Sequence, residues 1–273
     1  MSGRIGALIV NALLGLAAAL ALFPLVWMVS VSFMSPGEAG ASPPPLWPHI
    51  ATLANYRELL LRQGVGRDFL NSLLLAAGAT ALALTFNVMA GYAFAKLKFA
   101  GRERLLQILL GALVIPGQVA MMPLFLMLKA MGLINSYAGV LVPSIAGVFG
   151  IFLVRQYALS IPDEMLEAAR VDGAGELRIF TSIVLPALQP ILVTLATFTF
   201  LASWNDFMWP LIVLTDSSLY TLPVALASLS REHVQDNELM MAGAVITVLP
   251  VLVIFIALQR YYTRGLLAGS VKG

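Results

Sequence analysis

Long apolar stretches separated by short polar connections dominate the pattern of hydrophobic and polar positions along the chain. A helix needs about 20 mostly apolar residues to cross the hydrocarbon core of a bilayer. The stretches that meet this length lie at about residues 6–34, 69–95, 105–128, 137–158, 188–214 and 239–261. They lack the alternation of a membrane-spanning barrel, so we predict helices, which satisfy their own backbone polar groups in lipid. The expected fold is an all-α membrane protein with six transmembrane helices in a single transmembrane domain, residues 1–273.

Composition supports lipid as the solvent along the whole chain. Of the 273 residues, 60% are hydrophobic and 11% are charged, whereas a soluble domain carries about 25% charged residues. The net charge of +2 comes with no dense basic stretch, which argues against a nucleic-acid partner. The chain has no cysteine, and this excludes disulfides, thiolate metal sites and cysteine catalysis.

The first apolar stretch could also be a signal peptide. Its uncharged run covers residues 5–37, far longer than the roughly 7–15 residues of a signal-peptide core. Ala39-Gly40-Ala41 loosely resembles a cleavage site, which keeps that alternative open. We interpret the stretch as a membrane anchor.

The distribution of Lys and Arg predicts the orientation, because cytoplasmic connections carry an excess of both residue types. One set of connections holds 11 of the 16 basic residues and the other set holds five. The richer set consists of Arg4, Lys96, Lys98, Arg102, Arg104, Arg155, Arg170, Arg178, Arg260, Arg264 and Lys272. We therefore expect both termini inside and the connections 35–68, 129–136 and 215–238 outside. Prolines 43–45 predict an extended course for the first of these.

The longest predicted cytoplasmic connection, residues 156–188, has the pattern of a helix–turn–helix. Ser160 is a candidate N-cap with Pro162 and Asp163 in the first turn, and acidic side chains suit that end of a helix. Gly173 is the expected end, since glycine allows the positive φ of a helix stop. A second short helix then leads to Leu185-Pro186. The loop is net −2 over residues 155–178, which favours a protein partner over anionic lipid.

This loop resembles the "EAA" loop of ABC-type importer permeases. The matching residues are Glu167, Ala168, Ala169, Asp172, Gly173, Ala174, Ile183, Leu185 and Pro186. They lie between the fourth and fifth predicted spans, as in that family. The resemblance implies that the loop is a coupling loop docked on an ATPase subunit. In this interpretation Gly173 makes the turn and Glu167 contacts or orients the ATPase surface, and the docked loop drags the fourth and fifth spans.

Softer motifs extend the resemblance to the carbohydrate branch of the family, in particular to the smaller permease of maltose-type sugar importers. They are Asn55-Tyr56, Trp204-Asn205-Asp206-Phe207, Tyr220-Thr221-Leu222-Pro223 and the ending Gly265–Gly273. The implied partners are a second permease in a heterodimer, two ABC ATPase subunits and an extracytoplasmic sugar-binding protein. The implied location is a prokaryotic cytoplasmic (inner) membrane, crossed several times.

Candidate pathway residues surround the one ionisable residue deep within a predicted span, Asp206. A charge in a membrane normally faces a cavity or a partner. The functional interpretation is that Asp206 accepts a sugar hydroxyl, with Trp204, Asn205 and Trp209 beside it. The competing interpretation is that Asp206 braces the contact with the second permease or lies at the wet outer end of the span. By resemblance, Arg264 and Lys272 in the C-terminal tail are candidate ATPase contacts.

The chain itself carries no signal for catalysis. Nothing in it matches the phosphate-binding loop that ends in Gly-Lys-Ser/Thr, so we expect no cofactor or metal on this chain and Mg-ATP on the partner ATPases. An intramembrane enzyme would need paired catalytic groups within spans, and a secondary transporter would need more charges there or an internal repeat. Glycerol phosphate or an amino-sugar remains open as an alternative cargo to a sugar or oligosaccharide.

Overall fold

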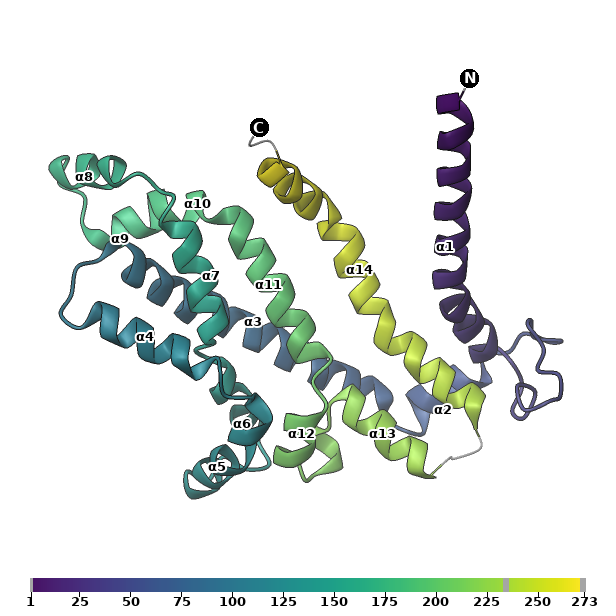
Figure 1. The fold of residues 1–273 in the computed structure, drawn as a ribbon. Coiled ribbons are helices and arrows are strands. Elements are labelled where there is room, and N and C mark those ends of the chain that lie inside the picture. Colours follow the sequence, from purple (N-terminus) through teal and green to yellow (C-terminus); the bar gives the residue numbers. More distant parts are fainter. Residues whose placement is uncertain (1, 233–235, 271–273) are drawn as a thin grey trace. The chain divides into compact units, whose positions relative to one another are not determined.

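The computed structural model describes residues 2–232 and 236–270, and the regular structure within these ranges is helical (Figure 1). The α-helices are α1 (Ser2–Ser32), α2 (Ala54–Leu61), α3 (Val65–Lys96), α4 (Arg102–Ala112), α5 (Gly117–Ala130), α6 (Tyr137–Leu141), α7 (Val148–Ala158), α8 (Asp163–Val171), α9 (Glu176–Ile179), α10 (Leu185–Ala187), α11 (Gln189–Trp204), α12 (Met208–Val213), α13 (Leu222–Glu232) and α14 (Asn237–Ser270). Two 3-10 turns, η1 (Val142–Ser144) and η3 (Ser217–Leu219), and a π-helical segment, η2 (Phe180–Val184), complete the helical structure of the described residues.

The described residues group into two compact units. The first comprises those of Met1–Phe69 and Ala225–Pro250, and the second those of Leu70–Val224 and Val251–Gly273. The prediction of a single domain is not tested by this grouping and stays a prediction.

Length and composition identify the spans in the described residues. Four helical segments are long and apolar enough to cross a membrane, namely Gly6–Ser32, Val65–Lys96, Tyr137–Ala158 and Asn237–Gln259. Two further helix pairs qualify only as bent pairs, with a bend of 105° between α4 and α5 and of 79° between Glu176–Ala187 and α11. The fold thus has four to six candidate transmembrane helices, and the predicted orientation of its termini stays a prediction.

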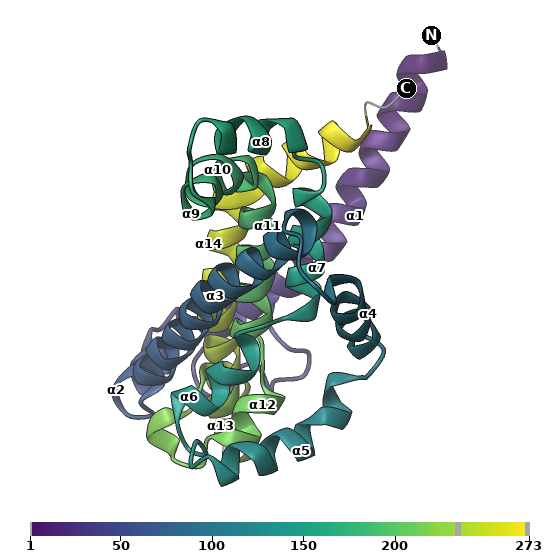
Figure 2. The same cartoon turned by 90° about the vertical axis from the view of Figure 1, so that its left-hand side faces the viewer.

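The third predicted span, residues 105–128, is a bent pair of helices rather than one continuous helix. α4 ends at Ala112 and α5 begins at Gly117, with Pro116 as its N-cap residue. Proline lacks an N–H and disfavours helical backbone at the residue before it, which explains the break. Figure 2 shows the two helices meeting at the bend.

The predicted extended course of residues 35–68 was wrong, because turns and a short helix occupy most of this connection. Residues 33–53 form turns and irregular backbone, but residues 54–61 form α2 and α3 already begins at Val65. Leu59 is fully buried, so packing of one face stabilises this short helix. The predicted connection 215–238 likewise contains α13.

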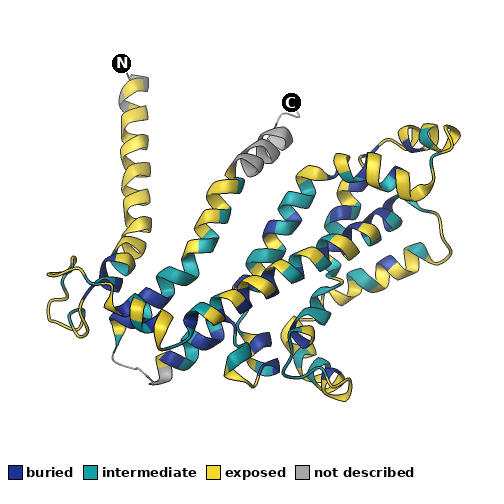
Figure 3. Cartoon of the chain, turned by 180° about the vertical axis from the view of Figure 1, so that it is seen from behind, coloured by how far each residue is buried: buried dark blue, intermediate teal, exposed yellow. Residues whose placement is uncertain are grey.

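Hydrogen bonds from side chains stabilise the backbone of the first unit just after α1. The Asn55 Nδ2 donates to the carbonyls of Ser32 and Met34 at 3.0 and 2.9 Å, which satisfies acceptors that a helix end leaves open. Glu38 accepts hydrogen bonds from the backbone N–H groups of Ser35 and His49 at 2.9 and 2.7 Å. The backbone hydrogen bonds lower the pKa of Glu38, so these contacts are present at neutral pH and are lost only as the pH falls through that lowered pKa. By contrast, none of the 18 most apolar consecutive residues of α1 is buried (Figure 3).

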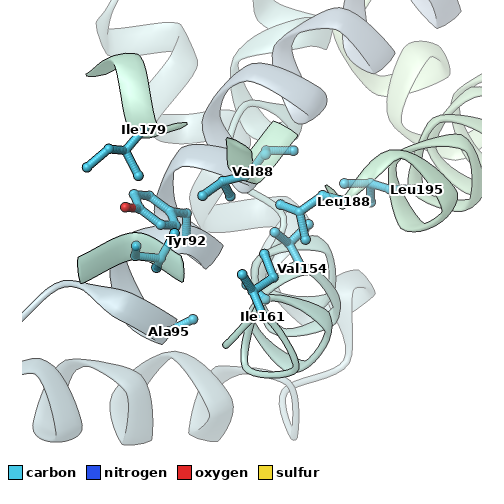
Figure 4. Close-up of a cluster of buried hydrophobic side chains, with 11 residues drawn as sticks. Val88, Tyr92, Ala95, Val154, Ile161, Ile179, Leu188 and Leu195 are labelled. Atoms are coloured by element: carbon cyan, nitrogen blue, oxygen red, sulfur yellow. The ribbon is translucent and has the colours of Figure 1, made fainter. Parts of the chain in front are cut away.

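A buried cluster in the second unit joins α3, α7 and α11 to the segment 161–188. Its buried members are Val88, Tyr92, Ala95, Val154, Ala158, Ile161, Leu166, Ile179, Val184, Leu188 and Leu195. Figure 4 shows their side chains converging from these elements. We call this set the loop core, because it includes six residues of the predicted cytoplasmic connection, 156–188.

One residue in the second unit depends on an unusual backbone conformation. Asn135 has φ of 58°, and its Oδ1 accepts hydrogen bonds from the N–H groups of Thr215 and Asp216 at 3.0 and 2.9 Å. We expect Asn135→Ala to destabilise the protein by about 1–3 kcal/mol, because the bonds are lost and left-handed backbone is strained for alanine. Asn135→Gly loses the same bonds without the strain and should cost less. Thermal unfolding of both variants checks this order, and equal costs would contradict it.

Candidate functional site

The first helix of the predicted coupling loop is α8, and its beginning differs from the expectation. Pro162 is the N-cap residue and makes no side-chain capping bond. The predicted cap, Ser160, instead donates its hydroxyl to the carbonyl of Tyr157 at 2.7 Å. The prediction for Ser160 was therefore wrong, because its hydroxyl satisfies the end of α7 rather than the start of α8. Asp163 and Glu164 do lie in the first turn of α8, where the helix dipole favours acidic side chains.

The end of α8 is the glycine turn that the sequence predicts. Gly173 has φ of +82°. Its N–H donates to the carbonyl of Arg170 at 3.0 Å, and the N–H of Ala174 donates to the carbonyl of Ala169 at 2.9 Å. This pair of bonds is a Schellman motif, in which the residue after the helix end adopts left-handed backbone. The positive φ of this turn therefore favours glycine at position 173.

The second half of the loop leads back toward the predicted fifth span. α9 is followed by the π-helical segment η2 and then by α10, which contains Pro186. The chain then bends by 79° into α11. The predicted helix–turn–helix and the turn near Pro186 are thus present, with a π-helical segment that the sequence did not indicate.

The predicted coupling residues divide between an outer surface and the loop core. Glu167, Ala168, Asp172, Gly173 and Pro186 are exposed. Ala169, Ala174 and Leu185 are half-buried and pack against the loop core. The loop also exposes apolar side chains, with Met165 at 43%, Val171 at 88% and Leu177 at 76%. An exposed surface of this kind on an otherwise anchored loop is suited to contact with another protein.

Polar contacts from α3 hold both short helices of the loop. Lys96 Nζ donates to the carbonyl of Ile161 and to Asp163 Oδ1, both at 2.6 Å. Tyr92 donates its hydroxyl to Glu176 Oε2 at 3.1 Å, and Arg170 Nε donates to Glu176 Oε1 at 2.6 Å. These contacts were not predicted from the sequence, in which Lys96 indicates only orientation and Tyr92 has no assigned role.

The Lys96–Asp163 contact is insensitive to pH near neutrality. The hydrogen bond from Lys96, followed by its charge, lowers the pKa of Asp163 below its ordinary value of 3.8. Because the pKa of Asp163 is lowered, the contact stabilises the folded chain fully above pH 3.8. This stabilisation is lost as the pH falls through the lowered pKa. The contact is therefore intact throughout the neutral range.

The predicted pathway residues lie at a break in the fifth span rather than within a helix. α11 ends at Trp204 and α12 begins at Met208, so Asp206 lies between them and its Oδ1 accepts a hydrogen bond from the N–H of Trp209 at 3.3 Å. Asp206 and Trp209 line a cavity of about 310 Å³. Its other polar lining residues are Ser144, Thr199 and Ser203. The expectation that Asp206 lies inside a continuous span was wrong.

Trp204 and Asn205, the other two predicted pathway residues, are not among the described residues that line this cavity. Trp204 is 1% exposed and its ring stacks on Phe200 at 5.9 Å between centroids. Asn205 is exposed and its Nδ2 donates back to the carbonyl of Leu201 at 2.8 Å. The structure thus brings Asp206 and Trp209 together at the cavity, whereas Trp204 and Asn205 do not belong to its lining in the described chain.

The candidate C-terminal contacts are only partly within the structure. Lys272 lies outside the described residues, and Arg264 is described by its backbone alone, as part of α14. In residues 2–232 and 236–270, no group of three or more His, Asp or Glu side chains is placed to hold a metal ion.

Comparison with known proteins assigns this architecture. Residues 87–267 match the family described as the binding-protein-dependent transport system inner membrane component. The chain belongs to this family. A relative from Halalkalibacterium halodurans, the arabinooligosaccharides transport system permease protein AraQ, is 37% identical over 94% of this chain and 93% of its own. The lactose transport system permease protein LacG of Rhizobium radiobacter is 32% identical over 98% of this chain and 97% of its own.

A solved structure shares the fold. A chain in the crystal structure of a bacterial ABC transporter involved in the import of the acidic polysaccharide alginate matches with a TM-score of 0.85. The match covers 96% of this chain and 98% of that chain, at 24% identity. This protein is therefore a multi-pass membrane component of a binding-protein-dependent transport system, and the predicted resemblance to importer permeases is confirmed.

Proposed function

We propose that this chain is one of two permease subunits of an ATP-driven importer in a prokaryotic cytoplasmic membrane. Its partners would be a second permease, two ABC ATPase subunits that bind Mg-ATP, and an extracytoplasmic solute-binding protein. Family membership supports the binding protein as a partner. The chain supplies the pathway and no catalytic group of its own, so the energy comes from the ATPases.

The observation that carries the proposal is the exposed coupling loop. α8 presents Glu167, Ala168 and Asp172 outward, while Leu166 is 1% exposed and anchors the helix in the loop core. The apolar side chains of Val171 and Leu177 are 88% and 76% exposed beside them. A partner surface that covers these side chains would gain from their burial, at about 25 cal/mol per Å². We propose that this partner is an ATPase subunit.

The proposed cargo is a sugar or an oligosaccharide. Both relatives described above are named for such cargo, arabinooligosaccharides in one case and lactose in the other. In the cavity beside Asp206, the lining contributed by the described residues includes hydroxyl groups, an indole and one carboxyl group, but no basic side chain. Glycerol phosphate, the anionic alternative, would favour basic groups, so this lining supports an uncharged sugar.

Charge reversal at Glu167 tests the docking surface. We expect Glu167→Lys to lower the recovery of the ATPase with a tagged chain by about tenfold, which corresponds to about 1.4 kcal/mol. Glu103→Lys, on α4, is the matched control: Glu103 pairs with Arg102 at 3.0 Å in an exposed ion pair, and such pairs contribute little to stability. Equal ATPase recovery with both variants would contradict a docking role for Glu167.

A further inference from the structure

The loop core is joined to α3 by packing as well as by polar contacts. Tyr92 is 4% exposed, and its ring lies 5.3 Å from that of Phe180 between centroids. Its hydroxyl reaches Glu176 of α9, and that carboxylate also accepts from Arg170 of α8. One turn further along α3, the side chain of Lys96 is 5% exposed and reaches Ile161 and Asp163 before and at the start of α8. Both short helices of the loop are therefore fixed to the same end of the same helix.

α3 is uninterrupted, unlike the spans that the loop connects in sequence. Residues 137–158 contain the 3-10 turn η1, and the fifth span breaks between Trp204 and Met208. α3 runs from Val65 to Lys96 without a break, a length of about 48 Å at 1.5 Å per residue. Rigid secondary elements can carry coupling between distant sites, whereas a break in a helix is a place where the chain can bend.

The same helix reaches the cavity. Ala79 of α3 lines it together with Asp206 and Trp209, and Leu75 packs in a buried cluster with Trp209 and Val213. Nearer its beginning, Asn71 donates to the carbonyls of Ser218 and Tyr220 at 3.1 and 2.9 Å. α3 thus contacts the loop at one end and the wall of the cavity along its other half.

We propose that Tyr92 and Lys96 are positioning residues that couple movement of the loop to α3, and that α3 carries this movement to the cavity beside Asp206. The inference rests on the proposed docking of the loop on an ATPase. It modifies the sequence-based expectation that the loop moves the fourth and fifth spans, because their breaks are places where such movement can be lost. Neither residue touches the ATPase or the cargo in this proposal.

The absence of cysteine in the chain allows a direct test. Ser203→Cys places one thiol at the cavity lining. In the assembled importer, its rate of modification by a membrane-impermeant maleimide is measured without nucleotide and after trapping with ADP and vanadate. The ratio of the two rates measures how strongly the nucleotide state of the ATPase changes the accessibility of the cavity. Recovery of the ATPase with the tagged chain is measured on the same preparations.

We expect the double variant Tyr92→Phe/Lys96→Met to reduce this ratio by about fivefold or more while the ATPase is still recovered, since coupling between sites commonly amounts to 5–150-fold. Lys96→Arg keeps the charge and should preserve the ratio. Tyr157→Phe is the matched control and should preserve the ratio, because Tyr157 is 38% exposed and its backbone carbonyl, which phenylalanine keeps, is the group that accepts from Ser160.

The outcomes separate the inference from the proposed function. An unchanged ratio in the double variant, or a thiol that reacts equally in both states of the parent importer, would overturn the role of α3 while ATPase recovery still supports the docking. Should the double variant not assemble, Tyr92→Phe alone decides, because it keeps the packed ring and removes only the hydroxyl: a lowered ratio supports the proposal and an unchanged one contradicts it. A parent chain that recovers no ATPase would instead refute the proposed function.

Discussion

Replacing Gly173 by proline is expected to abolish recovery of the ATPase with this chain. Proline fixes φ near −65° and has no N–H, whereas Gly173 has φ of +82° and donates its N–H to Arg170 at 3.0 Å. The turn between α8 and α9 therefore cannot form with proline, at a cost of about 3 kcal/mol or more. Because the proposed docking surface lies on both sides of this turn, we expect at least a tenfold loss of ATPase recovery in a pull-down from mild detergent.

Two further substitutions show whether the backbone of this turn is responsible. Gly173→Asn should retain most of the recovery, since asparagine tolerates left-handed backbone better than other non-glycine residues. Gly175→Ala is the matched control: Gly175 has φ of −70°, and an added Cβ there meets no atom within 4 Å. Normal ATPase recovery with Gly173→Pro would show that the turn has no part in docking.

Adding a methyl group at Gly91 is expected to lower the thermal stability of the chain. A Cβ at this position of α3 would lie 2.7 Å from Val154 Cβ and 3.0 Å from the backbone nitrogen of Arg155. Val154 is fully buried in the loop core, so α3 and α7 must separate to make room. Overpacking of this kind typically costs about 1–3 kcal/mol, which we expect as a fall of roughly 2–10 °C in Tm for Gly91→Ala.

The matched control for this prediction is Gly111→Ala in α4. A Cβ at Gly111 meets no atom within 4 Å, and alanine is favoured over glycine within a helix by about 0.5–1 kcal/mol. The Tm of this variant should be equal to or above that of the parent chain in the same detergent. If Gly91→Ala were as stable as Gly111→Ala, the close approach of α3 and α7 would be wrong.

The sequence predicts the apolar segments well, but it does not decide which of their prolines break a helix. Hydropathy is summed over many residues, so α1 and α14 were found although Pro24 and Pro250 lie within them. Pro116, by contrast, separates α4 from α5. Neighbouring helices can satisfy the backbone groups that a proline frees in a membrane, so the local sequence alone does not distinguish a tolerated proline from one that ends a helix.

The same distinction applies to the candidate site. The turn at Gly173 was predictable, because a local conformation with positive φ strongly favours glycine. The contacts of Lys96 with Asp163 and of Tyr92 with Glu176 join residues 67 and 84 positions apart, and no local pattern encodes such pairs. Asp206 was found because it is a charge among apolar residues, but its place in a break between helices depends on how α11 and α12 pack.

Purification of this chain from its native locus, tagged at the N-terminus and extracted in mild detergent, shows whether it works as part of an ATP-driven importer. The copurifying proteins and their ATP hydrolysis are then identified. We expect an ABC ATPase and a second permease in the preparation, with ATP hydrolysis by the complex and loss of the ATPase in the Gly173→Pro variant. A chain that purifies alone and transports solute into liposomes without ATP would contradict the account and favour a stand-alone secondary transporter.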